Sequence, residues 1–287
     1  MLWSAIDTRL SYQVTGPAHF CFHLEVAHAA GQRLAGESLN IEGAGELRHF
    51  TDSVSGNRFL RFDAEPGEVH VHYRAEVERV PAPQPRRLAE MPISALPDEV
   101  MPYLLPTRYC ESDVMARAAQ QLFCNHKPGL ARVQAISDWI HDSIVYEPGS
   151  TDSTTTAQQV FVQRAGVCRD FAHLGVTFCR ALNIPARLVV GYVWFDEPPQ
   201  DFHALFEAWL GGRWVRFDPT RMAPVERVVQ VGTGRDAKDV AFCTLFGPVT
   251  MREKAITVRE YEAPRPRHRL GAASQPRPPT RRVALMA

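Results

Sequence analysis

The chain has 287 residues, which is enough for one large domain or two domains of modest size. Hydrophobic residues make up 45% and charged residues 22% of the chain, as in ordinary globular proteins with a buried core. Because 32 basic residues balance 32 acidic ones, no bulk charge attracts nucleic acid or anionic lipid. We therefore expect neither a nucleic-acid partner nor a membrane partner.

Two further features point to the cytoplasm as the expected location. No apolar run approaches the roughly 18 residues that a membrane-spanning helix needs. The first residues, MLWSAIDTRLSY, lack the basic head, apolar stretch and small-residue cleavage site of a secretory signal. Six cysteines are scattered without a CxxC pair, so we expect reduced thiols rather than a disulfide framework. They are Cys21, Cys110, Cys124, Cys168, Cys179 and Cys243.

Residues 1–85 are predicted to form a small antiparallel β-sandwich domain. Apolar residues fall on alternate positions in Phe20–Val26 and in Val69–Val77, and Arg58–Phe62 is another short candidate strand. Glycines separate these segments. Short alternating strands at this spacing are typical of a sandwich.

Prolines are dense from Pro81 to Pro106. Because proline lacks the backbone N–H that helices and β-sheets need for hydrogen bonding, residues 86–107 are predicted to form a linker. The residues 108–262 are assigned to a second domain that mixes helices and strands. The last stretch, 263–287, is rich in proline and arginine and is predicted to be a disordered basic tail.

Helices and strands alternate in the second domain. One helix is expected from a cap at Ser112 or Asp113 to Cys124. The other predicted elements are helices over 130–145, near 157–164 and over 168–182, and strands over 186–195, 202–210 and 213–217.

Cys168 is the first candidate for chemistry, because it is expected where a loop meets the start of a helix. The free amide groups and the dipole of a helix N-terminus favour an anion such as a thiolate. Arg169 adds a positive charge beside it. The alternative is that Cys168 is one more buried structural cysteine.

The segment 202–218 predicts a hairpin that brings a histidine to a carboxylate. A two-residue turn at Gly211-Gly212 pairs Leu210 with Arg213. In that register His203 is the diagonal neighbour of Asp218, with Cα atoms about 7–8 Å apart. Taken singly, His203 could be an ordinary strand histidine, and Asp218, which precedes Pro219, a turn former. Together with Cys168 they match a thiol, a base and a residue that orients the base.

The residues around these three positions resemble the transglutaminase-like superfamily. More narrowly, the chain is similar to bacterial members that carry a β-rich domain before the catalytic one. The stretches that carry the resemblance are Gly166–His173, Ala181–Arg187, Phe202–Ala204, Glu207–Trp209 and Trp214–Thr220. The resemblance implies an α+β, papain-like catalytic domain over 108–262. It also implies Cys168 as nucleophile, His203 as base and Asp218 as the orienting acid.

Other site residues are less strongly indicated. The backbone amide of Cys168 is a natural first oxyanion donor. Tyr146 or the loop 153–155 could supply the second donor. The alternative is that these residues only close the loop that precedes the nucleophile helix. Arg235 and Asp236 are placed near the cleft by resemblance alone. No cofactor is expected and no metal site, since no calcium loop is present and the nearby pair His70 and His72 lacks a third ligand.

The predicted function is cysteine-dependent hydrolysis or acyl transfer at a peptide-like amide, through a thioester, with a protein or peptide as substrate. Hydrolysis, by a protease or amidase, is favoured. The alternatives are amine transfer to protein glutamine, as in transglutaminases, and a non-catalytic binding or scaffold protein that keeps the fold.

Overall fold

The computed structural model describes residues 2–80, 88–197 and 199–262. The tail predicted for 263–287 and the first two residues of the predicted linker lie outside these ranges. Within the described residues, the chain forms three four-stranded antiparallel sheets, one short parallel pair of strands and four α-helices. None of the described helices is long and apolar enough to cross a membrane.

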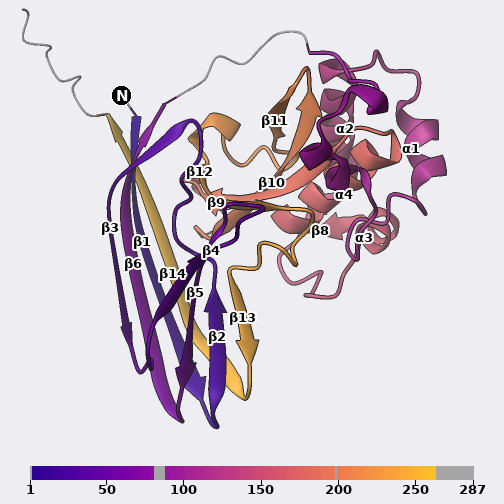
Figure 1. Ribbon diagram of the computed structural model, residues 1–287. Helices are drawn as coiled ribbons and strands as arrows, with labels where there is room; N and C mark the ends of the chain where they lie inside the picture. Colours follow the sequence, from indigo (N-terminus) through magenta and orange to yellow (C-terminus); the bar gives the residue numbers. More distant parts are fainter. Residues whose placement is uncertain (1, 81–87, 198, 263–287) are drawn as a thin grey trace, which may run out of the picture.

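Two of the four-stranded sheets face each other in the strand-rich part of the molecule, on the left of Figure 1. One has the order β14-β1-β6-β3 and the other the order β13-β2-β5-β4. The strands are β1 (Leu2–Val14), β2 (Ala18–Phe22), β3 (Gln32–Glu42), β4 (Arg48–Thr51), β5 (Arg58–Ala64), β6 (Gly67–Arg79), β13 (Cys243–Phe246) and β14 (Val249–Glu262).

Alternating burial along these strands produces the sandwich. Along β6, apolar side chains on every second position turn inward, and the residues between them face outward. The inward faces of both sheets meet in one apolar core that includes Tyr12, Phe20, Phe62 and Tyr73. This arrangement confirms the predicted antiparallel, strand-rich N-terminal part.

The boundary predicted for the sandwich needs a correction at the other end of the chain. The residues 243–262 were assigned to the catalytic domain, but β14 pairs with β1 and β13 pairs with β2. Figure 1 shows the first strand and the last strand side by side. Periodicity identifies a strand but not its partner. These two strands were assigned to the catalytic domain because they follow it in the sequence, whereas they pair with strands of the sandwich.

The helical part follows strands β1–β6 along the chain, and its elements pack around one central helix. Its main elements are α1 (Ala116–Phe123), α2 (Leu130–Ser143), α3 (Ala157–Gln163), α4 (Cys168–Ala181), β9 (Ala186–Tyr192), β10 (Phe202–Leu210), β11 (Arg213–Phe217) and β12 (Val229–Gly234). Shorter pieces are η1 (Ile93–Ala95), η2 (Asp98–Leu104), β7 (Val145–Tyr146), β8 (Ala165–Gly166) and η3 (Val225–Arg227).

Helix α4 is the centre of this part. It packs on β9 and β10 of the sheet ordered β11-β10-β9-β12, and α1, α2 and α3 contact its other sides. Every residue of α4 from Asp170 to Arg180 is buried. Gly175 has no room for a side chain, because a Cβ there would lie 2.4 Å from the ring of Phe206 on β10. The close approach of helix and sheet fixes where the first residue of α4 lies.

The sandwich and the helical part share a buried boundary. Tyr192 of β9 and Val231 of β12 belong to the apolar core of the sandwich. The hydroxyl of Tyr192 donates to the carbonyl of Leu24 at 2.8 Å, and the side chain of Asn57 donates to the carbonyl of Thr233 at 2.9 Å. The sandwich is therefore packed directly against the sheet that carries the candidate site.

Candidate active site

Cys168 is the first residue of α4, as predicted, and its side chain is half-buried. Val167 before it has an extended backbone and caps the helix. The carboxylate of Asp170, three residues further on, accepts the backbone N–H of Val167 at 2.9 Å. The thiol therefore lies at a helix N-terminus whose entry is held by a side chain of the same helix.

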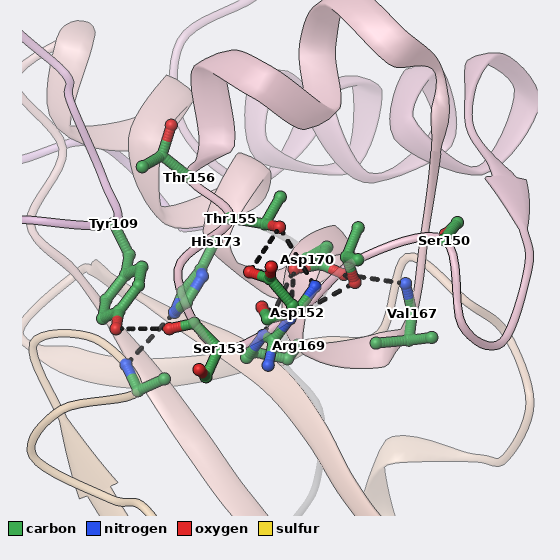
Figure 2. A network of polar contacts seen from close by, with 12 residues as sticks. Tyr109, Ser150, Asp152, Ser153, Thr155, Thr156, Val167, Arg169, Asp170 and His173 are labelled. Atoms are coloured by element: carbon green, nitrogen blue, oxygen red, sulfur yellow. Dashed lines mark hydrogen bonds and ion pairs between the residues drawn. The ribbon is translucent and has the colours of Figure 1, made fainter.

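The carboxylate of Asp170 also ties a loop to the nucleophile helix, as Figure 2 shows. The side chain of Asp170 is 1% exposed. It accepts the hydroxyl of Thr151 at 2.6 Å and pairs with the guanidinium of Arg169 at 3.1 Å. Arg169 also donates to the carbonyl of Asp152 at 2.8 Å. The positive charge predicted beside Cys168 is thus engaged by Asp170 and by the loop.

The hairpin of β10 and β11 has the predicted register. Leu210 pairs with Arg213, and Gly211 and Gly212 both take the positive φ that such a turn needs. On one face of this hairpin, Nε2 of His203 lies 2.8 Å from Oδ2 of Asp218. His203 is 1% exposed and Asp218 is 8% exposed. The diagonal pair expected from the sequence is therefore formed, and it is buried.

The surroundings of His203 favour the charged imidazolium. Burial alone lowers the pKa of this ring, but the hydrogen bond that the ring donates to Asp218, the contact with the Cys168 thiol and the charges of both outweigh burial and raise the pKa to about 10. The second oxygen of Asp218 accepts the backbone N–H and the hydroxyl of Thr220, at 3.0 and 2.7 Å. Because Asp218 engages Nε2, Nδ1 is the ring nitrogen left for the thiol.

Tyr146 lies against the nucleophile. Strand β7 pairs with β8 in parallel, with Tyr146 opposite Gly166, two residues before Cys168. Burial, together with the charge of the nearby Cys168 thiol, raises the pKa of the tyrosine hydroxyl, which lies close to both the backbone and the side chain of Cys168. The structure thus brings together four of the predicted site residues: Cys168, His203, Asp218 and Tyr146.

Known proteins with similar chains or folds were compared with this one. The family model described as the transglutaminase-like superfamily matches residues 116–219. The solved structure of a candidate cysteine protease from Cytophaga hutchinsonii is 36% identical, covers 92% of each chain and superimposes with a TM-score of 0.86. The chain belongs to the transglutaminase-like superfamily.

Mycobacterial relatives match over a shorter range. An uncharacterized protein of Mycobacterium leprae is 34% identical over 164 residues, which are 53% of this chain and 57% of that protein. A second one, from Mycobacterium tuberculosis, is 32% identical over 143 residues, which are 45% of this chain and 46% of that protein. The transglutaminase-like chain thus spans about half the length of these relatives.

Arg235 and Asp236 do not join the other predicted site residues of this transglutaminase-like protein. The guanidinium of Arg235 pairs with Asp239 at 2.9 Å, and its carbonyl accepts from Arg180 near the end of α4. Arg180 is twelve residues after Cys168, about 18 Å along the helix. Asp236 is buried and accepts the backbone N–H of Lys238 at 2.8 Å. These contacts tie Arg235 to the end of α4 and Asp236 to its own loop, and the placement of both residues near the cleft stays a prediction from the resemblance.

The transglutaminase-like site also contains residues that sequence reasoning had not assigned. Asp170 caps α4 and ties the loop, and its signal was an acidic residue at the third position of the helix. Phe195 packs edge-on against the ring of His203, with centroids 6.0 Å apart. No local pattern indicates that contact, because Phe195 lies beyond the end of β9.

Within the described part of the chain, no group of three or more His, Cys, Asp or Glu residues is arranged to hold a metal ion. The two histidines considered for a metal have other partners. His70 lies 3.2 Å from Glu68, and His72 lies 3.0 Å from Asp7. Each is therefore engaged by a carboxylate at the surface of the sandwich.

Proposed function

We propose that this protein is a cysteine-dependent hydrolase of peptide-like amides, with Cys168 as nucleophile, His203 as base and Asp218 as the residue that orients the base. The observation that carries the proposal is the buried 2.8 Å contact between His203 and Asp218 beside a thiol at a helix N-terminus. Family membership and the similarity to a candidate cysteine protease support a thiol enzyme of this kind.

In the proposed reaction the proton of Cys168 resides on Nδ1 of His203, whose surroundings favour the imidazolium, and the sulfur reacts as a thiolate. The thiolate then attacks the carbonyl carbon of the amide, and its oxygen becomes an oxyanion. Asp218 holds the ring through Nε2 and stabilises the imidazolium that forms. As the carbon–nitrogen bond breaks, the imidazolium gives its proton to the leaving amine, and the acyl group stays on the sulfur as a thioester.

The oxyanion has two proposed donors. One is the backbone N–H of Cys168, and the other is the hydroxyl of Tyr146, which is held within hydrogen-bond reach of that residue by the pairing of β7 with β8. Donors fixed before the reaction stabilise the developing charge without reorganisation. In the second half of the reaction, His203 takes a proton from water, and the resulting hydroxide releases the acyl group from the sulfur.

Amine transfer differs from hydrolysis only in the last acceptor. If a primary amine replaces water, the same thioester yields a new amide and the activity of a transglutaminase. Because Cys168 is half-buried rather than enclosed, water can reach the thioester, and we favour hydrolysis.

The test is incubation with peptide and amine libraries, followed by mass spectrometry, with wild type and Cys168→Ala compared. The proposal predicts cleaved or deamidated peptides that are absent with the variant. Amine adducts that depend on Cys168 would identify amine transfer instead. Identical product profiles for the two proteins would contradict the enzymatic proposal and favour a scaffold that keeps the fold.

A further inference from the structure

A cavity lies between the sandwich and the turn end of the β10–β11 hairpin. Its volume is about 480 Å³, within the usual range for small-molecule sites. The end of β6 and a loop after β2 form one wall, through Arg79 and the residues 29–31. The strands β9, β10 and β11 form the other wall, and Glu226 and Gln230 complete the lining.

This cavity shares a face of the hairpin with the triad but is separated from it. The guanidinium of Arg216 donates to the carboxylate of Glu207 on the neighbouring strand at 3.0 Å. Both side chains lie on the face of the hairpin that carries His203 and Asp218. Between the two sites, Leu205 is fully buried in a small apolar cluster with Val189 and Val228. The cavity is therefore separated from the triad by packed apolar side chains.

The lining carries more positive than negative charge. Four guanidinium groups line the cavity, and two carboxylates, Glu207 and Glu226, accompany them. Glu207 is shared, since it pairs with Arg187 at 2.7 Å and with Arg216 at 3.0 Å. The other two guanidinium groups, Arg79 and Arg213, have no carboxylate within ion-pair distance among the described residues.

Arg79 is unusual because it is buried without a carboxylate partner. It is 5% exposed, and it donates to the backbone carbonyls of Arg227 and Glu226. Its Nε–H has no hydrogen-bond partner among the described residues. Burial, with the charge of Arg216, lowers the pKa of Arg79 to about 10. A buried cation in this condition is costly, and an anion bound next to it would offset the cost.

A second buried donor lies in the same lining. The indole Nε1–H of Trp209 also lacks a hydrogen-bond partner among the described residues. The neighbouring ring of Trp214 packs against it, with centroids 5.2 Å apart, and the guanidinium of Arg187 lies 4.2 Å from the centre of that ring. The cavity thus combines guanidinium groups with an aromatic wall.

We propose that this cavity binds a small molecule through an oxyanion group, either a carboxylate or a phosphate, which the net positive charge of the lining attracts and which Arg213 and Arg79, the two guanidinium groups without a carboxylate partner, contact. Guanidinium groups match the planar, paired oxygens of both anions. Binding at this site does not require the triad.

The test is calorimetric titration of the full chain with inorganic phosphate and, separately, with succinate, against sodium chloride at the same ionic strength. Wild type is expected to show saturable binding of at least one oxyanion beyond the chloride baseline. Arg213→Gln removes an exposed cation and should weaken that binding about tenfold, the effect of losing one hydrogen bond to a charged group. Arg117→Gln, an exposed arginine on α1 outside the cavity, is the matched control and should change affinity less than twofold.

The two probes separate the sources of the anion. Tighter binding of phosphate indicates a phosphorylated ligand, and tighter binding of succinate indicates a carboxylate ligand. Either result supports the site if Arg213→Gln weakens it. No saturable binding of either anion, or equal affinity in wild type and Arg213→Gln, would overturn the proposal.

Discussion

Two buried histidines, His173 on helix α4 and His203 on strand β10, have opposite acid–base properties. His203 and His173 are both 1% exposed. His203 contacts a carboxylate and a thiol, and its pKa is raised to about 10. His173 stacks on Tyr109, with centroids 5.4 Å apart, and accepts the backbone N–H of Ala237 at 3.1 Å. Burial lowers the pKa of His173 to about 3.

The contrast shows that burial alone does not produce a general base. Burial penalises the charged form of both rings, and only a buried carboxylate in direct contact reverses the effect. His173 lies five positions from Cys168 on the same helix, and its contacts with Tyr109 and Ala237 give it a packing role. The candidate base is therefore identified by its partner, Asp218, and not by its depth.

The largest expected effect comes from replacing each histidine in turn. His203→Gln should slow alkylation of Cys168 by iodoacetamide at pH 7 by about 10²-fold, since the thiol loses the base that accepts its proton. His173→Gln keeps an acceptor for Ala237 and should change this rate less than threefold. Mass spectrometry of the peptide that carries Cys168 measures both rates. Equal slowing by the two variants would remove the distinction between the histidines.

The same two variants should change the pH dependence of stability in opposite directions. The folded-state pKa of His173, about 3, lies below the ordinary value near 6.5, so wild type loses stability as pH falls below 6.5. The folded-state pKa of His203, about 10, lies above it, so this contribution is complete below pH 6.5 and is lost as pH rises toward 10. The comparison needs only these two variants and wild type.

Urea unfolding at pH 5, 7 and 9 measures these contributions. Between pH 7 and 5, wild type should lose about 2 kcal/mol more than His173→Gln. Between pH 7 and 9, wild type should lose about 2 kcal/mol more than His203→Gln. Parallel pH profiles for all three proteins would show that neither ring titrates as its surroundings indicate.

Tyr146→Phe should separate oxyanion stabilisation from thiol activation. The variant keeps the ring but removes the hydroxyl that reaches Cys168. Acylation of the thiol by p-nitrophenyl acetate passes through an oxyanion and should slow about tenfold, the effect of one hydrogen-bond donor. Alkylation by iodoacetamide forms no oxyanion and should change less than threefold. Equal effects on both reactions would assign Tyr146 to packing.

The smallest expected effect concerns the loop in Figure 2. Thr151→Val removes the 2.6 Å hydrogen bond to Asp170 and should lower the free energy of unfolding by about 1 kcal/mol. Thr154→Val removes an exposed hydroxyl that bonds only within its own loop, to Asp152, and serves as the control. A loss from Thr154→Val as large as that from Thr151→Val would show that the loop is not held through Asp170.

Local chemistry made much of the candidate site predictable. The turn at Gly211-Gly212 fixes the register of the hairpin, and that register alone brings His203 to Asp218. The helix that begins at Cys168 follows from its apolar spacing. The family resemblance supplied the link between these two distant segments, because periodicity within a segment contains no information about a contact across thirty-five residues.

Other features depend on contacts that no local pattern encodes. Pairing of β14 with β1 joins the two ends of the described chain, and a search for local strands does not reveal it. The first α-helix begins at Ala116 rather than at the predicted cap near Ser112 or Asp113, because a turn with its own backbone hydrogen bonds precedes the helix. The contact between the carbonyl of Arg235 and Arg180, near the end of α4, likewise joins residues far apart in the sequence.

Competition between two cysteines of the wild-type chain tests the proposed Cys168–His203–Asp218 unit most directly. Cys124 is exposed and Cys168 is half-buried, so access alone predicts faster alkylation of Cys124. An activated thiol beside His203 predicts the reverse order, with Cys168 alkylated at least about tenfold faster at pH 7. Faster or equal labelling of Cys124 by iodoacetamide would contradict the catalytic account.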